Sequence, residues 1–191
     1  MRTPNRRQVV SFAAASLAAS ALPGCAGPGR PDPDDPTRSL VFGYIDMSGA
    51  PTPVDWVSLR CYTCADPRSH YQISIKDGLI LHPAIQPGSY QIDVFGGSNS
   101  LGIFSGAEHR YNFGTTQRND SALRIDRPGA YFLGAWRYVA QSGRAFSMQP
   151  LTTQSEKDLL ARVVASMRDD QDLRRYGRGL VLAQQRLAQL R

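Results

Sequence analysis

The stretch HYQISIKDGLIL, residues 70–81, decides the fold class of this chain. Tyr71, Ile73 and Ile75 alternate with polar residues, which is the two-residue period of a half-buried strand. The Lys-Asp-Gly sequence at 76–78 is a turn signal, because glycine adopts positive φ without steric cost. The apolar run Leu-Ile-Leu that ends the stretch begins another strand. These residues therefore predict two β-strands joined by a tight turn.

The same signals recur over residues 39–150. Further strands are expected at residues 40–45, 54–62, 90–94, 123–125, 130–139 and 145–148. Short strands separated by turn signals at intervals of roughly 8–12 residues indicate a β-sandwich or a barrel. The sequence thus predicts one mainly β domain over residues 39–150.

The hydrophobic period changes after this domain. Thr153 and Glu156 have the spacing of a capping box, so a helix is expected to begin there. Apolar residues then recur at helical spacing as far as Met167, and the Asp-Asp pair at 169–170 interrupts them. A second apolar stripe follows, so residues 153–191 are predicted to form a helical hairpin.

Two turn sequences carry a family resemblance. Gln-Pro-Gly-Ser-Tyr at 86–90 and Arg-Pro-Gly-Ala-Tyr at 127–131 both place Pro-Gly just before a strand. This pattern resembles the carboxypeptidase-regulatory-like, transthyretin-like β-sandwich of many exported bacterial proteins. With the terminal helices, the chain is also similar to a group of small uncharacterised envelope lipoproteins. The resemblance implies a prealbumin-like antiparallel β-sandwich with a role in binding, spacing or surface presentation.

The N-terminus has the features of an export signal. In residues 1–24, three arginines precede an uncharged apolar run at 9–22, which is too short to span a bilayer comfortably. The sequence Leu-Pro-Gly-Cys at 22–25 resembles a lipobox. The resemblance implies that residues 1–24 are a lipoprotein signal peptide and that Cys25 carries the lipid, including palmitate.

The residues around this signal bear on the export route and the location. Residues 5–10, NRRQVV, resemble a twin-arginine motif, and both twin-arginine and general secretory export remain open. Residues 25–38 are rich in proline and predict a linker with a reach of about 40 Å. Ala26, rather than aspartate, follows the lipidated cysteine. The resemblance therefore implies anchoring in the outer membrane, facing the periplasm.

The charge distribution argues against a nucleic-acid partner. The chain has 22 basic and 16 acidic residues, and three of the basic ones lie in the signal peptide. The excess of basic residues that is left lies wholly in residues 155–191. A nucleic-acid-binding domain would instead carry a basic stripe over its fold.

Cys61 and Cys64 form the sharpest chemical motif, a C-x-x-C pair. Three interpretations stay open: a disulfide, a redox pair, or half of a metal site. The motif ends a strand and lacks the helix N-terminus that lowers a thiol pKa in many redox pairs. His70 and His82 are weak candidate partners for a metal, because zinc needs four ligands.

The strand 131–138 is the most aromatic segment of the chain. Strict alternation would place Phe132, Trp136 and Tyr138 on one face. Trp136 and Tyr138 could contact a glycan or a protein partner if that face is exposed, and they would belong to the core if it is not. No nucleophile-elbow, zincin or phosphate-loop motif occurs. The sequence therefore predicts a non-enzymatic envelope lipoprotein without a cofactor.

Overall fold

The computed structural model describes residues 32–64, 70–98, 108–112, 123–141 and 146–190. The signal peptide expected at 1–24, the lipidation site Cys25 and the first residues of the linker 25–38 lie outside the described residues. The expected β domain and C-terminal helical segment lie largely within them.

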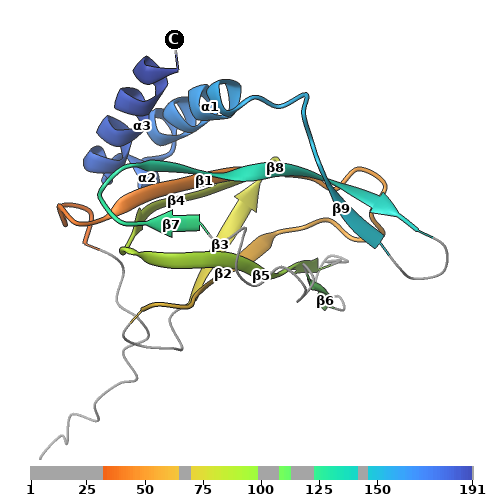
Figure 1. Cartoon of the computed structure of the whole chain (residues 1–191). Coiled ribbons are helices and arrows are strands. Elements are labelled where there is room, and N and C mark those ends of the chain that lie inside the picture. The colour runs from red at the N-terminus through yellow and green to blue at the C-terminus, as the bar shows by residue number, and fades with distance from the viewer. Residues whose placement is uncertain (1–31, 65–69, 99–107, 113–122, 142–145, 191) are drawn as a thin grey trace, which may run out of the picture. The chain divides into compact units, whose positions relative to one another are not determined.

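The described strands form one curled sheet (Figure 1). The strands are β1 (Ser39–Asp46), β2 (Trp56–Cys61), β3 (His70–Lys76), β4 (Leu79–Ile85), β5 (Gly88–Ser98), β6 (Glu108–Asn112), β7 (Leu123–Ile125), β8 (Ala130–Ala140) and β9 (Phe146–Pro150). Their order is β6-β5-β2-β3-β4-β1-β8-β9, and β7 pairs with β5. The helices are α1 (Glu156–Asp169), α2 (Gln171–Arg174) and α3 (Gly177–Gln189). The prediction of a mainly β chain with a helical C-terminus is therefore confirmed.

The sheet is mixed, so the expectation of a purely antiparallel arrangement is wrong. β1 and β8 run parallel from Leu40 beside Ala130 to Asp46 beside Arg137. Neighbouring pairs such as β1 with β4 and β2 with β5 are antiparallel. A parallel pair needs a long crossover connection, which here contains β2 to β7. Turn signals mark where strands end, but they do not tell which distant strands will pair.

β3 joins the two halves of the curl. Its residues from His70 to Ser74 pair with β2, and Ile75 and Lys76 pair with β4. One face of both halves encloses the inner cluster. The buried members of this cluster are Val41, Ile45, Val57, Leu59, Cys61, Ile73, Ile80, Ile85, Tyr90, Phe95, Tyr111 and Ile125. The inner cluster is thus built from β1 to β7.

The outer face of β1, β4 and β8 lies under the helices (Figure 1). The buried residues there form the helix-side cluster: Leu40, Phe42, Leu79, Ala84, Ala135, Leu151, Leu159, Leu160, Val163, Val164, Met167, Tyr176 and Ala183. β1 contributes to both clusters, which explains its continuous apolar sequence from Leu40 to Phe42.

The helical segment begins two residues later than the capping box predicted from Thr153 and Glu156. Ser155 is the N-cap, and its hydroxyl accepts a hydrogen bond from the backbone N–H of Asp158 at 3.1 Å. The expected break is present, since Asp170 ends α1 and caps α2. In the described part of the chain, no helix has both the length and the apolar character needed to span a membrane.

A bulge changes the phase of the aromatic strand β8. Gly134 has φ of +122°, a conformation that side-chain-bearing residues rarely adopt. The register between β1 and β8 shifts at this point, between Phe42 and Tyr44. Phe132 therefore packs on the helix-side cluster, whereas Trp136 and Tyr138 pack on the inner cluster. The prediction that these three rings share a face is wrong, because one additional residue reverses the alternation.

Candidate functional site

The two cysteines of the C-x-x-C motif are joined by a disulfide in the structure. Cys61 is the last residue of β2 and is 2% exposed, inside the inner cluster. Cys64 lies three residues further in a bend and is half-buried. The backbone N–H of Cys64 donates a hydrogen bond to Sγ of Cys61 at 3.1 Å. The disulfide thus joins a buried cysteine, Cys61, to a half-buried one, Cys64.

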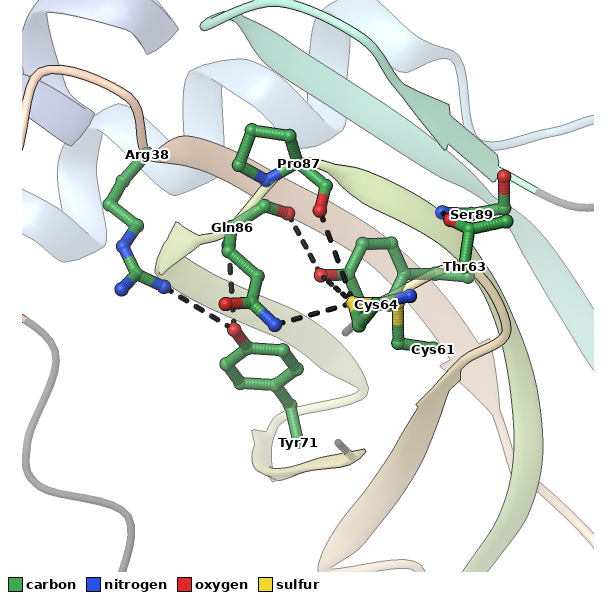
Figure 2. The surroundings of a disulfide bond; sticks show 9 residues. Arg38, Cys61, Thr63, Cys64, Tyr71, Gln86, Pro87 and Ser89 are labelled. Carbon is green, nitrogen blue, oxygen red and sulfur yellow. Dashed lines mark hydrogen bonds between the residues drawn. A yellow bond between two sulfur atoms is a disulfide. The ribbon is translucent and has the colours of Figure 1, made fainter. Parts of the chain in front are cut away.

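Residues of the turn before β5 surround Cys64 (Figure 2). The amide Nε2 of Gln86 donates to Sγ of Cys64 at 3.2 Å. The hydroxyl of Tyr90 lies 3.5 Å from the same sulfur and donates to the carbonyl oxygen of Gln86 at 2.8 Å. The carbonyl oxygen of Pro87 is 3.9 Å from this sulfur. Figure 2 shows the Gln86 side chain lying between Tyr71 and Cys64.

Gly88 allows the backbone of β5 to approach the disulfide. A Cβ atom at this position would lie 2.8 Å from Sγ of Cys61 and 3.0 Å from Sγ of Cys64. Neither distance is compatible with normal packing, so only glycine fits here. The Pro-Gly turn noted in the sequence therefore also brings β5 against the sulfurs.

A second set of hydrogen bonds runs from Gln86 to the end of the linker. The Tyr71 hydroxyl accepts hydrogen bonds from the Gln86 backbone N–H and from Nη1 of Arg38, both at 3.4 Å. Arg38 also pairs with Asp35 at 2.8 Å. Hydrogen bonds from Thr37 and then from Arg38 lower the pKa of Asp35 to about 2. Arg38 and the ionised carboxylate of Asp35 therefore form an ion pair on this side of the network.

His82 borders this network on β4. Its ring meets that of Tyr71 edge-on at a centroid distance of 4.9 Å. Burial, and then the charge of Arg38, lower the pKa of His82 to about 4. Nδ1 accepts a hydrogen bond from the Ala84 N–H at 3.3 Å, which requires that this nitrogen is unprotonated. His82 is therefore a neutral imidazole near pH 7.

Tyr90 forms the buried side of the disulfide site. It is fully buried, and its ring centroid lies 5.9 Å from that of Tyr71. Burial raises the pKa of Tyr90 above its usual value, and its electrostatic interaction with Tyr71 adds to the rise. The hydroxyl is therefore neutral and donates its proton to the Gln86 carbonyl oxygen, so the Gln86 side-chain amide is the donor to Cys64, and Arg38 lies further out.

The weak metal candidates are not brought together. His70 is exposed at the start of β3, in register with Arg60, and His82 interacts with Ala84 and Tyr71. The disulfide also leaves neither cysteine as a thiolate, the form that binds zinc. Within the described ranges, no group of three or more His, Cys, Asp or Glu residues could hold a metal ion.

The candidate contact residues Trp136 and Tyr138 face the interior of the curl and are half-buried. The Tyr138 ring stacks on Phe146 of β9 at 5.5 Å and meets Tyr111 of β6 edge-on at 6.3 Å. Phe146 also contacts Tyr111 at 5.3 Å. Aromatic side chains thus connect the two outer strands of the sheet, β6 and β9.

A separate groove lies between the helical segment and the start of β8. Its volume is about 640 Å³, and its lining includes Arg127, Tyr131, Glu156, Gln185 and Arg186. Glu156 is paired there with Arg186 at 2.8 Å. The lining contains neither cysteine nor histidine, so the groove is distinct from the disulfide network.

Sequence reasoning found Cys61, Cys64 and His82 but missed the residues that connect them. Tyr71 and Gln86 were assigned only to a strand and to a turn. The Gln86 amide contacts Cys64, and the Tyr71 hydroxyl contacts the Gln86 backbone, through the pairing of β2 with β3 and β5. No local spacing encodes that pairing. The one available signal was that Gln86 belongs to a Pro-Gly turn, which indicates a close backbone approach.

Comparisons of the chain with protein-family models, with curated proteins and with solved structures found no match.

Proposed function

We propose that this protein is a lipid-anchored envelope lipoprotein that acts as a non-enzymatic interaction or structural module. The observation that carries the proposal is the disulfide between Cys61 and Cys64, because disulfides persist in oxidising compartments such as the periplasm. The lipobox-like sequence that ends at Cys25 supports the same compartment. The Pro-rich residues 25–38 then hold the β domain away from the membrane surface.

The proposal includes the location and the fold family. Ala26 after the lipidated cysteine favours the outer membrane, with the domain in the periplasm. A transthyretin-like sandwich is supported by the two halves of the curl, which share the inner cluster. The parallel pairing of β1 with β8 is the feature that any such family assignment has to accommodate.

Expression of the full chain in a Gram-negative host tests the anchor. The N-terminal peptide of the mature protein should carry a diacylglycerol and a further acyl chain on Cys25, and the protein should sediment with the outer membrane. The Cys25→Ser variant should lose both the lipid and the membrane association. Recovery of the unsubstituted chain as a lipid-free soluble protein would contradict the proposal.

Glycan binding is the second candidate, and the partial exposure of Trp136 and Tyr138 favours it. The chain has two tryptophans, Trp56 and Trp136. A Trp56→Phe variant therefore reports only on Trp136, and a Trp136→Phe variant only on Trp56. Soluble peptidoglycan fragments should change the fluorescence of the first variant and not of the second. An unchanged emission in both would reject glycan binding by this strand.

A further inference from the structure

The two cysteines of the disulfide differ in their exposure. Cys61 is 2% exposed, whereas Cys64 is half-buried in the bend after β2. Exchange begins when an external thiolate attacks one sulfur in line with the S–S bond, so accessibility selects the sulfur that is attacked. Cys64 is the more exposed of the two cysteines, so its sulfur is the favoured point of attack.

The buried sulfur has a donor ready for the charge that develops when the bond breaks. The backbone N–H of Cys64 points at Sγ of Cys61 over 3.1 Å. A hydrogen bond to a thiolate favours the charged form and makes it a better leaving group. This backbone donor replaces the helix N-terminus that supports the thiolate in many redox pairs.

Sγ of Cys64 also has a hydrogen-bond donor, the side-chain amide of Gln86. The Gln86 amide donates to Sγ of Cys64 over 3.2 Å, and the neutral Tyr90 hydroxyl lies at 3.5 Å. The amide is itself fixed in place, because the Gln86 backbone bonds to Tyr71 and Tyr90. Each sulfur therefore has an N–H donor that can stabilise the thiolate formed when the S–S bond breaks.

The surrounding strands do not depend on the S–S bond. β2 pairs with β5 along its whole length, ending with Cys61 beside Tyr90. Beyond the strand, the Tyr62 N–H bonds to the Ser89 carbonyl, and the Ser89 N–H bonds to the Thr63 hydroxyl, each at 2.9 Å. A disulfide between residues only three apart also restricts the unfolded chain less than any longer loop does. The reduced form should therefore keep this fold.

We propose that Cys61–Cys64 is a reactive disulfide that exchanges with an external dithiol, with Cys64 as the attacked sulfur and Cys61 as the leaving group. This activity goes beyond the binding role proposed above and does not rest on the anchor. Its substrate class is a dithiol, borne by a protein or by a small molecule.

The exchange balances in two steps. A thiolate of the dithiol attacks Sγ of Cys64 and forms a mixed disulfide, and Sγ of Cys61 leaves with the electron pair and takes up a proton. The second thiol of the reductant then loses its proton and attacks its own sulfur in the mixed disulfide. This step releases Cys64 as a thiolate, which is protonated. The pair has gained two electrons and two protons, and the dithiol has become a disulfide.

Peptide mapping of the full chain tests the attacked sulfur without any substitution. The chain is treated with an excess of a small monothiol under native conditions, quenched with acid and digested. Trypsin cleavage after Arg60 and Arg68 leaves CYTCADPR, which carries both cysteines and is separate from the peptide of Cys25. Fragmentation should place the mixed disulfide on Cys64. A mixed disulfide on Cys61, or on both cysteines equally, would overturn the proposal.

A small dithiol provides the second arm. Native protein should be reduced at this pair while its far-ultraviolet circular dichroism stays unchanged. A disulfide that resists the dithiol until denaturant unfolds the protein would show a purely structural bond and would refute the proposal. The Cys25→Ser variant should behave identically, so a failed anchor and a failed exchange are distinguishable.

Variants with a single cysteine, made in the Cys25→Ser background, measure the asymmetry. Cys64 in a Cys61→Ser variant should react with a small aromatic disulfide at least about tenfold faster than Cys61 in a Cys64→Ser variant. Equal rates would contradict the assigned roles.

Gln86 is tested in the Cys61→Ser background. Replacing Gln86 with leucine should raise the pKa of the Cys64 thiol, measured from the pH dependence of its reaction rate, whereas glutamine-to-asparagine replacement should raise it less. An unchanged pH profile in both variants would remove Gln86 from the exchange.

Discussion

The imidazole of His82 links the candidate site to stability. Burial, followed by the charge of Arg38, lowers its pKa to about 4, compared with 6.5 in the unfolded chain. Between these pH values the unfolded state binds more protons than the folded state, so the free energy of unfolding falls as the pH drops from 6.5 towards 4. Above pH 6.5 the contribution of His82 is constant.

The expected slope is about 1 kcal/mol per pH unit within this window, because the unfolded state there binds nearly one proton more at His82 than the folded state does. Urea unfolding at several pH values between 7 and 4 measures it. A His82→Gln variant should lose most of the dependence. The lowered pKa of Asp35 acts below pH 4 and does not overlap with this window. Identical slopes in the two proteins would contradict the assigned cause.

Cys61 and Cys64 should contribute little to global stability. For a closed loop of four residues, the loss of unfolded-chain entropy corresponds to about 2 kcal/mol. A Cys61→Ser, Cys64→Ser double variant should therefore unfold with a free energy about 2 kcal/mol lower and otherwise keep its fold. Chemical denaturation of both proteins under oxidising conditions gives the difference. A loss above about 5 kcal/mol would show that the bond is needed to hold β2 against β5.

The C-x-x-C pair could be identified from the sequence, because its two cysteines are only three positions apart. The remainder of the site could not be predicted in the same way. Gln86 meets Cys64 only because β2 and β5 pair with Cys61 beside Tyr90. Arg38 arrives from the linker side of β1 and reaches Tyr71 on β3. Contacts of this kind between distant residues depend on the strand register, which a single sequence does not specify.

Capping decides where α1 begins. The Ser155 hydroxyl accepts from the Asp158 N–H and donates to Oδ2 of Asp158 at 2.6 Å, so the pair forms the cap that was assigned to Thr153 and Glu156. Ser155→Ala should lower the free energy of unfolding by about 1 kcal/mol. Thr153→Ala, which lies outside the cap, should change it by less than about 0.5 kcal/mol. Thermal unfolding of the two variants separates these expectations, and a larger loss of stability in Thr153→Ala would show that Thr153 is the N-cap.

The strands that are bounded by clear turn signals could be predicted from the sequence. Which strands pair with one another could not be predicted. Residues 70–81 gave β3, its turn and the beginning of β4 because alternation and Asp77-Gly78 are local properties. β6 was missed, since its five residues Glu-His-Arg-Tyr-Asn are mostly polar. The bulge at Gly134 was also missed. A glycine inside an apolar strand signals a bulge, but it does not say which face each flanking ring will take.

In the described domain, the strands β1 and β4 each contribute buried residues to both clusters. β1 places Val41 and Ile45 in the inner cluster and Leu40 and Phe42 in the helix-side cluster. The helices therefore cover an apolar face of the sheet that would otherwise be exposed, rather than forming an independent appendage. Removal of apolar contacts in the helices should consequently lower the stability of the sheet itself.

Leu160 of α1 offers the direct test, since it is fully buried in the helix-side cluster. Leu160→Ala should lower the free energy of unfolding by about 2–5 kcal/mol, because the smaller side chain leaves a cavity between α1 and the sheet. Val181→Ala on α3 is the matched control: Val181 is 48% exposed, so its loss should change the free energy by less than about 0.5 kcal/mol. The tryptophan bands of the near-ultraviolet circular dichroism include Trp136, which packs on the inner cluster, and neither tryptophan belongs to the helix-side cluster; the far-ultraviolet signal includes the helices. In the Leu160→Ala protein both signals should shift to lower denaturant by the same amount, since β1 and β4 couple the two clusters. Helix loss at low denaturant with an unshifted aromatic transition would instead show that the helices unfold independently of the sheet.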